Sequence, residues 1–112
     1  MNKEDEKVLQ PKIASRDVTM HILKAFGLRM SKKLGQTFLI DARIVQGIVD
    51  AAEVKPGDRV LEIGPGIGTL TQGLAEAGAD VTAVELDKKL PAVLKETLKA
   101  YDNVRSVPGD SL

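Results

Sequence analysis

The sequence predicts an α/β fold in which two helices precede a parallel three-stranded sheet with the strand order 3-2-1. The main observation is an alternation that begins at residue 59. Short runs of branched apolar residues alternate there with stretches whose apolar residues recur every three or four positions, which is the pattern of strands alternating with helices. Strands joined through helices in this way run parallel and are connected by right-handed crossovers.

The length and composition of the chain limit what it can be. Its 112 residues suffice for one domain with a modest core. The chain has no cysteine, which excludes disulfide bonds and zinc-thiolate sites, and we predict no metal site. No apolar run approaches the roughly 20 residues of a membrane-spanning helix, and the charged N-terminus does not resemble a signal peptide. We therefore expect a cytoplasmic protein.

The first predicted element is a helix near the N-terminus. Ser15 is a suitable N-cap and Gly27 a suitable end. The apolar residues between them fall at helical spacing, namely Val18, Ile22, Leu23 and Phe26. His21 lies in the same helix without an acidic partner or second ligand at a useful spacing, so we expect it on the surface.

A second helix is predicted after a loop over residues 28–40. Asp41 is its N-cap, and one face carries the apolar residues Ile44, Val45, Ile48, Val49 and Ala52. A Pro-Gly-Asp turn at residues 56–58 then leads into the first strand. The elements that follow are a strand at 59–63, a helix capped by Thr69 that ends near Gly78, a strand at 81–85, a helix at 88–99 and a strand at 104–107.

The turn after the first predicted strand has the sequence EIGPGIG over residues 62–68. Glycine at every second position lets the backbone bend sharply and come close to a ligand, and the following helix points its free amide groups at that ligand. Dinucleotide-binding folds have the pattern G-x-G-x-x-G/A, whereas the third glycine comes one residue early here, at Gly68. An acid two residues before the first glycine instead resembles S-adenosylmethionine-dependent methyltransferases, where the Glu62 carboxylate could pair with the methionine ammonium. A merely structural turn is the alternative.

Acidic residues also follow the next two strands. Glu85 ends the second predicted strand, at the edge where ligands of open α/β sheets bind, and its two oxygens can accept both hydroxyls of a ribose. Asp110 follows the third strand and is placed to accept the adenine amino group. Asp87 could share the role of Glu85, but we expect it to cap the next helix. The alternatives are a solvated glutamate at residue 85 and an ordinary turn aspartate at residue 110.

The charges are unevenly distributed although the net charge is zero. Residues 1–35 contain eight Lys and Arg against four Asp and Glu, which gives a net charge of +4. Residues 53–87 contain two against seven, which gives −5. A basic arm ahead of an acidic core fits contact with a polyanion at one end. Solvated surface charge explains the pattern equally well.

Four motifs together resemble the bacterial small-subunit rRNA adenine dimethyltransferases, to which the erythromycin-resistance rRNA methylases are related. They are KLGQTFLID at residues 33–41, EIGPGIG at 62–68, ELD at 85–87 and GD at 109–110. The resemblance runs from about residue 31 to the last residue. Its most specific part is the loop around Gln36, because generic methyltransferases lack it.

The resemblance implies a partial Rossmann-like methyltransferase fold, S-adenosylmethionine as cofactor, and dimethylation of two adjacent adenosines near the 3′ end of 16S rRNA. The residues that it places on the cofactor are Thr37, Leu39, Gly64, Glu85 and Asp110, with Gln36, Glu62, Gly66 and Gly68 as further candidates. The family usually has asparagine where this chain has Thr37, which keeps a hydroxyl but loses the amide. Lys32 and Lys33 are candidates for phosphate contacts, and the 30S subunit is the implied partner.

The family's catalytic loop, an Asn-Leu-Pro-Tyr-like sequence after a fourth strand, has no match among the 112 residues. We therefore assign no catalytic residue and expect that loop to lie beyond Leu112. The chain is then a fragment, inactive alone, in which residues 1–30 form a basic arm and helix and residues 31–112 form the first half of the cofactor-binding domain. The uncovered first strand could support self-association. Two other functions stay open: a non-catalytic RNA-binding or ribosome-assembly module, and half of a nicotinamide-dependent oxidoreductase.

Overall fold

A computed structural model describes residues 11–28 and 41–109 of the chain. Within these ranges the helices are α2 (Arg16–Ala25), α3 (Ala42–Ala51), α4 (Thr69–Glu76) and α5 (Leu90–Thr97), and the strands are β1 (Arg59–Ile63), β2 (Asp80–Glu85) and β3 (Val104–Pro108). Every predicted helix and strand is present, with ends that differ by a few residues. None of the helices in these ranges is long and apolar enough to cross a membrane.

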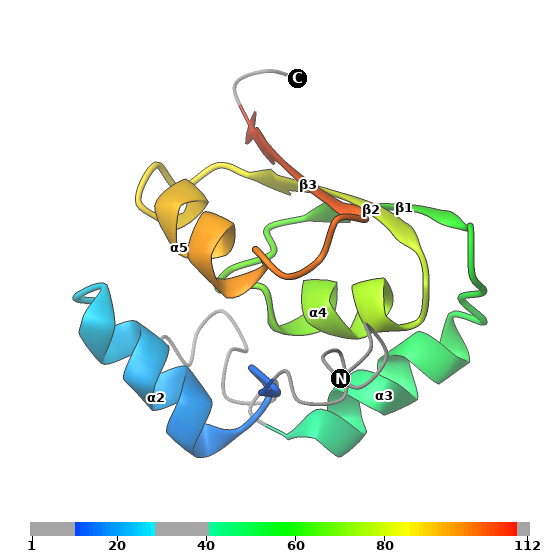
Figure 1. Cartoon of the computed structure of the whole chain (residues 1–112), viewed down its shortest axis with the longest axis horizontal. Helices are drawn as coiled ribbons and strands as arrows, with labels where there is room; N and C mark the ends of the chain where they lie inside the picture. The colour runs from blue at the N-terminus through cyan, green and yellow to red at the C-terminus, as the bar shows by residue number, and fades with distance from the viewer. Residues whose placement is uncertain (1–10, 29–40, 110–112) are drawn as a thin grey trace.

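The strands form one parallel sheet in the order β1-β2-β3, which is the predicted order read from the other edge. The register aligns Val60 of β1 with Val81 of β2, and Val81 with Val104 of β3. Figure 1 shows the helices gathered on one side of this sheet. One face of the sheet is therefore covered, and among the described residues no helix lies on the other.

The core lies between the covered face and the helices. Val81 and Ala83 of β2 are 0% exposed, and full burial of an aliphatic side chain of valine size contributes about 1.5–3 kcal/mol to stability. The apolar residues form two clusters. The first joins α2 to α5 and includes Ile22, Leu23, Val93, Leu94 and Leu98; the second joins α3, α4 and β2 and includes Val49, Leu74 and Val81.

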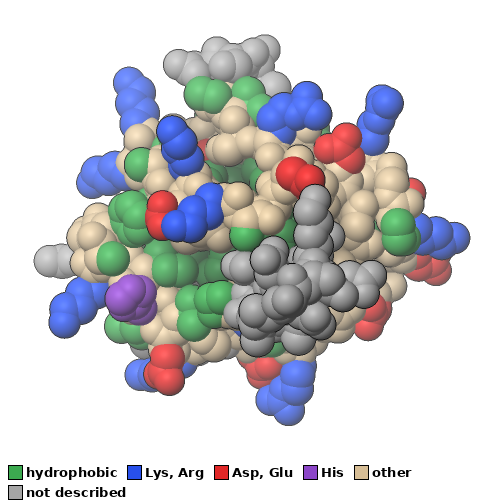
Figure 2. Space-filling view, viewed as in Figure 1, with side chains coloured by type: hydrophobic (Ala, Val, Ile, Leu, Met, Phe, Trp, Pro, Cys, Tyr) green, Lys and Arg blue, Asp and Glu red, His purple; other side chains and the backbone are tan. Residues whose placement is uncertain are grey.

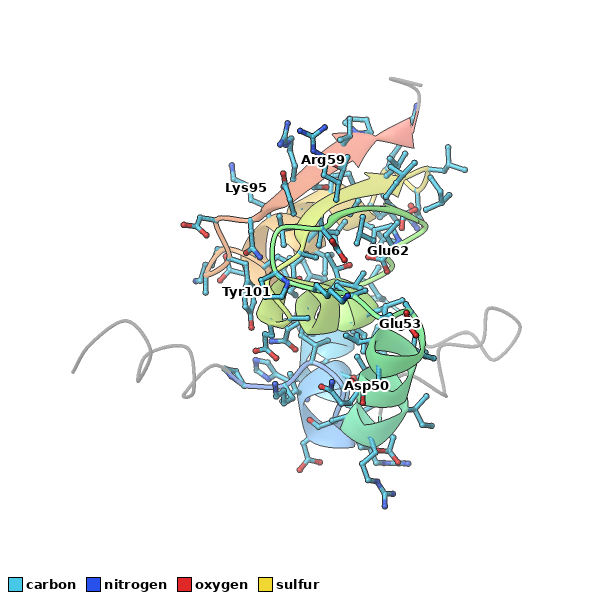
Figure 3. The ribbon with its side chains drawn as sticks, turned by 90° about the vertical axis from the view of Figure 1, so that its right-hand side faces the viewer. Asp50, Glu53, Arg59, Glu62, Lys95 and Tyr101 are labelled. Atoms are coloured by element: carbon cyan, nitrogen blue, oxygen red, sulfur yellow. The ribbon has the colours of Figure 1, made fainter. Side chains whose placement is uncertain are left out.

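A buried polar network holds the segment before α2 against α4. The Gln72 side chain accepts a hydrogen bond from the Ile13 backbone N–H at 2.8 Å and donates one to the Pro11 carbonyl at 2.8 Å. It also donates to the Tyr101 hydroxyl at 2.9 Å, which in turn donates to Glu76 at 2.8 Å. Burial raises the pKa of Tyr101, and the hydrogen bond to Glu76 adds to this, so the hydroxyl stays protonated. Figure 3 shows Tyr101 beside α4, on the helix side of the sheet.

Of the four predicted helix N-caps, those of α2 and α3 are confirmed and those of α4 and α5 are wrong. Ser15 accepts from the Val18 N–H at 3.1 Å and caps α2, and Asp41 accepts from the Arg43 N–H at 2.9 Å and caps α3. Thr69 was predicted to cap α4, but it is the first residue inside that helix. The N-cap is Gly68, which makes no side-chain cap bond. Its φ of 97° lies in the left-handed region, which glycine adopts more readily than threonine.

The predicted apolar face of α3 is only half buried. Val45 and Val49 are buried, whereas Ile44 and Ile48 remain 40% exposed, because the described packing of α3 is mainly against α4. Asp87 was predicted to cap the following helix. Its carboxylate accepts from the Lys89 N–H at 2.9 Å, so it closes the turn just before α5 and not the first turn of that helix.

Candidate functional site

The glycine-rich turn joins the carboxyl end of β1 to α4. Gly64 has a φ of 71° and Gly66 a φ of 62°, in the left-handed region that side chains other than glycine rarely adopt. A Cβ added to either residue would meet nothing within 4 Å. The backbone conformation therefore requires these glycines, and the space beside them is open to a ligand.

Glu85 lies at the carboxyl end of β2 and is fastened to this turn. One carboxylate oxygen accepts from the Gly66 N–H at 3.2 Å. The other accepts from the N–H groups of Leu86 at 2.8 Å and Asp87 at 3.1 Å. With 8% of its surface exposed, the carboxylate has one rotamer fixed by three donors. The oxygen that faces Gly66 retains a second acceptor site, because a carboxylate oxygen can accept two hydrogen bonds.

Glu62, two residues before the turn, lies on the covered face of β1. Its carboxylate accepts a hydrogen bond from the Thr71 hydroxyl of α4. Burial raises the pKa of Glu62; the Thr71 hydrogen bond partly offsets this, and the negative charge of Glu85 raises the pKa further. In Figure 3, Glu62 lies between the sheet and the helices, whereas Arg59 of the same strand lies on the opposite side of the sheet.

The two carboxylates make the carboxyl end of the sheet a place for a cation. Within residues 11–28 and 41–109, no Lys or Arg forms a salt bridge with Glu62 or Glu85; the ion pairs there join other residues. Two acids near one another without a cationic partner favour a positively charged ligand group between them. The turn and its two acids thus offer one open acceptor site for a hydroxyl group and negative charge for a cationic group.

A cavity lies toward the other end of the sheet, on the face that no described helix covers. It measures about 540 Å³ and is lined by residues at the beginnings of the strands, including Arg59, Asp80 and Arg105. Ligands of open parallel sheets bind outside the carboxyl ends of the strands. This cavity is therefore separate from the glycine turn, and its size alone does not make it the functional site.

The structure brings part of the predicted cofactor site together. Gly64, Gly66 and Gly68 form the turn, with Glu62 and Glu85 beside it. The other predicted site residues lie outside the described ranges: Lys32, Lys33, Gln36, Thr37, Leu39 and Asp110. Leu112, beyond which the catalytic loop is expected, also lies outside these ranges, so the position of that loop stays a prediction.

Gly109, which precedes Asp110, lies against the end of β2. A Cβ on Gly109 would collide with the Leu86 side chain and lie 3.2 Å from the Glu85 carbonyl oxygen. The chain after β3 therefore starts beside Glu85, at the same end of the sheet as the glycine turn.

Thr71 was not singled out from the sequence. It is 0% exposed, and its hydroxyl binds Glu62. The available signal was a polar residue in the first turn of a helix, between the apolar residues Leu70 and Leu74. That signal is weak, because threonine near a helix start is common for capping reasons alone.

Comparison with known proteins identifies close sequence relatives. A family model described as ribosomal RNA adenine dimethylase matches residues 27–112. The ribosomal RNA small subunit methyltransferase A of Moorella thermoacetica is 51% identical over 100 residues, covering 89% of this chain and 35% of that protein. The protein of the same name from Alkaliphilus oremlandii is 50% identical over 101 residues, covering 90% of this chain and 35% of its own. The chain spans about a third of the length of these relatives.

Solved structures share the fold. The crystal structure of the 23S rRNA methyltransferase ErmE matches with a TM-score of 0.57 and 40% identity, covering 62% of this chain and 29% of that one. The glycopeptide N-methyltransferase MtfA, complexed with sinefungin, matches with a TM-score of 0.52 and 28% identity, covering 59% of this chain and 28% of that one. These matches confirm the predicted Rossmann-like α/β fold.

Proposed function

Since the chain belongs to the ribosomal RNA adenine dimethylase family, we propose that it forms the S-adenosylmethionine-binding part of an enzyme that methylates rRNA adenosines. Two adjacent adenosines near the 3′ end of 16S rRNA would each receive two methyl groups on the exocyclic nitrogen. The observation that carries the proposal is the Glu85 carboxylate, held against the Gly66 N–H at the carboxyl edge of the sheet. A parallel α/β sheet binds its ligands at this edge.

The residues of the turn fit the parts of this cofactor. Glu85 would accept a ribose hydroxyl through the one acceptor site that its backbone donors leave open, on the oxygen that faces Gly66. Glu62 would face the methionine ammonium, and the open space beside Gly64 would admit the ligand close to the backbone. Asp110 would accept the adenine amino group, with Thr37 and Leu39 contributing from the sequence before α3. When bound, S-adenosylmethionine supplies a methyl group activated by a sulfonium, and the protein contributes orientation of the reacting groups.

The Glu85→Ala variant tests the cofactor proposal. We expect it to lose about 1–3 kcal/mol of binding free energy for S-adenosylmethionine, because charge-assisted hydrogen bonds are left unmade. Titration calorimetry measures this, with circular dichroism as a check on folding and Glu96→Ala, an exposed glutamate of α5, as the matched control. Equal affinity in wild type and Glu85→Ala would contradict the ribose role. Tighter binding of NAD than of S-adenosylmethionine would favour an oxidoreductase.

Lys32 and Lys33 would contact rRNA phosphates, with the 30S subunit as partner. In the described part of the chain, Figure 2 shows Lys and Arg scattered around the rim of this view and not gathered in one patch. Replacing both lysines by alanine should lower the salt dependence of 30S binding by about two units of log–log slope. Lys95 and Lys99, both exposed on or just after α5, provide the control pair, and an unchanged slope would leave Lys32 and Lys33 as solvated loop charges.

A polypeptide of residues 1–112 would bind the cofactor without transferring its methyl group. The 112 residues contain no Asn-Leu-Pro-Tyr-like sequence to accept the hydrogens of the target amine and to stack on the flipped base. Radiolabelled cofactor with undermethylated 30S subunits measures transfer, and a full-length relative serves as the positive control. Label in the rRNA above a blank would refute this expectation, while 30S binding without label would be compatible with an assembly module.

The edge of β1 would support self-association of this polypeptide. Among the described strands β1 pairs only with β2, so its other edge offers unpaired N–H and C=O groups. Leu61 and Ile63 are 63% and 58% exposed beside that edge. Light scattering should report dimers or larger species at high micromolar concentration, and Leu61→Lys should reduce them more than Leu86→Lys does. A clean monomer would exclude this association.

A further inference from the structure

Thr71 is the side chain that holds Glu62 in place, and it is not one of the residues proposed to contact the cofactor. Thr71 lies in the first turn of α4 and is 0% exposed, so its hydroxyl cannot exchange its partner for water. That hydroxyl donates to a carboxylate oxygen of Glu62, nine residues earlier on β1. The bond therefore ties the strand before the glycine turn to the helix after it.

The surroundings of Glu62 explain why this one hydrogen bond matters. Glu62 borders a cavity of about 520 Å³ between α3, β1 and α4. α3 and its C-cap contribute the apolar residues Ile48 and Ala52 to the cavity lining, and α4 contributes Leu70 and Leu74. The charged residues of the lining, besides Glu62, are Asp58 and Arg59, at the start of β1.

The other charged group that acts on Glu62 is Glu85 of β2, and its charge disfavours a second carboxylate. Burial disfavours it as well, and raises the pKa of Glu62. The Thr71 hydroxyl is the described group that opposes both effects, because a hydrogen bond donated to a carboxylate stabilises the ionised form.

We propose that Thr71 is a positioning residue for cofactor recognition: its hydroxyl holds the Glu62 carboxylate ionised and in place to receive the ammonium group of the cofactor's amino-acid end. This inference rests on the proposed function, and it assigns specificity for one end of the ligand to a residue that does not touch the ligand. Without the hydroxyl, Glu62 keeps its burial and the repulsion of Glu85, so it binds a proton more readily. A protonated Glu62 has no charge to offer an ammonium group.

Two variants and two ligands test the proposal. Thr71→Val keeps the shape of the side chain and removes the hydroxyl, while Thr71→Ser keeps the hydroxyl. The first measurement, without ligand, follows the carboxyl carbon of Glu62 by NMR during a pH titration. We expect a higher pKa in Thr71→Val than in wild type, with Thr71→Ser close to wild type.

The second measurement is binding by calorimetry between pH 5.5 and pH 8.5. S-adenosylmethionine carries the ammonium group, whereas 5′-methylthioadenosine has the same adenosine and no amino-acid end. We expect Thr71→Val to weaken S-adenosylmethionine binding about tenfold at the acid end of this range, which corresponds to about 1.4 kcal/mol, and less at the alkaline end. Binding of 5′-methylthioadenosine should be unchanged, and Thr71→Ser should restore S-adenosylmethionine binding.

Each result decides the matter. If Thr71→Val lowers the affinity for both ligands equally at every pH, Thr71 acts only on the fold. If the pKa of Glu62 is the same in Thr71→Val as in wild type, Thr71 does not control the carboxylate. Either result overturns the inference while the proposed function stands. A wild-type chain that binds neither ligand would overturn the proposed function and this inference together.

Discussion

The two faces of the sheet are built from the same three strands, yet they differ sharply in burial. On the face toward the helices, Val81 and Ala83 are 0% exposed. On the other face, Leu61 and Ile63 of the edge strand are more than half exposed, although Val84 of the central strand, opposite Ile63, is 1% exposed. Both faces carry apolar side chains, so residue type does not separate them. The difference follows from topology. A right-handed crossover from β1 to β2 and another from β2 to β3, both stepping in one direction, place α4 and α5 on the same side.

The face of the sheet that no described helix covers, here called the bare face, is not uniformly apolar. Its amino end carries Arg59, Asp80 and Arg105, where Arg105 approaches Asp80 at 4.0 Å. Its apolar residues lie toward the carboxyl end of β1, close to the glycine turn.

The largest difference in stability should appear between two leucine-to-alanine variants, one in the core on the covered side of the sheet and one on the bare face. Leu94 of α5 is 1% exposed in the core, and Leu94→Ala should lower the free energy of unfolding by about 2–5 kcal/mol. Leu61→Ala on the bare face should change it by less than about 0.5 kcal/mol. Urea denaturation followed by circular dichroism measures both. Similar losses in the two variants would show that the bare face is covered in solution.

A smaller effect is expected from the polar network on the covered side. Gln72→Leu removes the acceptor of the buried Ile13 N–H, and one buried donor left unsatisfied costs about 1–3 kcal/mol. The control is Gln46→Leu, whose glutamine is exposed and binds only Asp50 in the described contacts. Amide hydrogen exchange at Ile13 should accelerate in Gln72→Leu alone. Unchanged exchange there would show that the segment before α2 is held by its apolar contacts instead.

Sequence patterns predicted the elements well because strands and helices here have clear apolar periods and glycine-rich ends. They placed Glu85 at the carboxyl edge of the sheet, where the glycine turn also lies, since the carboxyl ends of parallel strands meet at one edge. The hydrogen bond from the Gly66 N–H to Glu85 was not predicted. They could not predict the Gln72 network or the Thr71 contact, because both join residues whose distance depends on how α4 rotates against the sheet. Nor could periodicity show that Ile44 and Ile48 stay half exposed, since a helix pattern does not say how many neighbours cover it.

The smallest expected effect concerns the one carboxylate of β1 on the covered face, and it depends on pH. Burial raises the pKa of Glu62 above its ordinary 4.5, so the folded chain holds this proton to a higher pH than the unfolded chain does. The stability that the protonated Glu62 contributes is complete below pH 4.5 and is lost as the pH rises through the pKa of the folded chain.

Glu62→Gln tests this, because glutamine keeps an oxygen that can accept a hydrogen bond from Thr71 but does not titrate. Relative to wild type, Glu62→Gln should therefore be more stable, with a larger free energy of unfolding, at pH 8 than at pH 4. Glu96→Gln on the exposed side of α5 should show little dependence on pH. Urea titrations at the two pH values measure this difference, and a variant that becomes relatively less stable at pH 8 would mean that the ionised carboxylate is stabilised in the fold. This direction of the pH effect matters for function. If the ionised Glu62 carboxylate destabilises the empty fold, a bound cationic ligand can offset that cost by pairing with it.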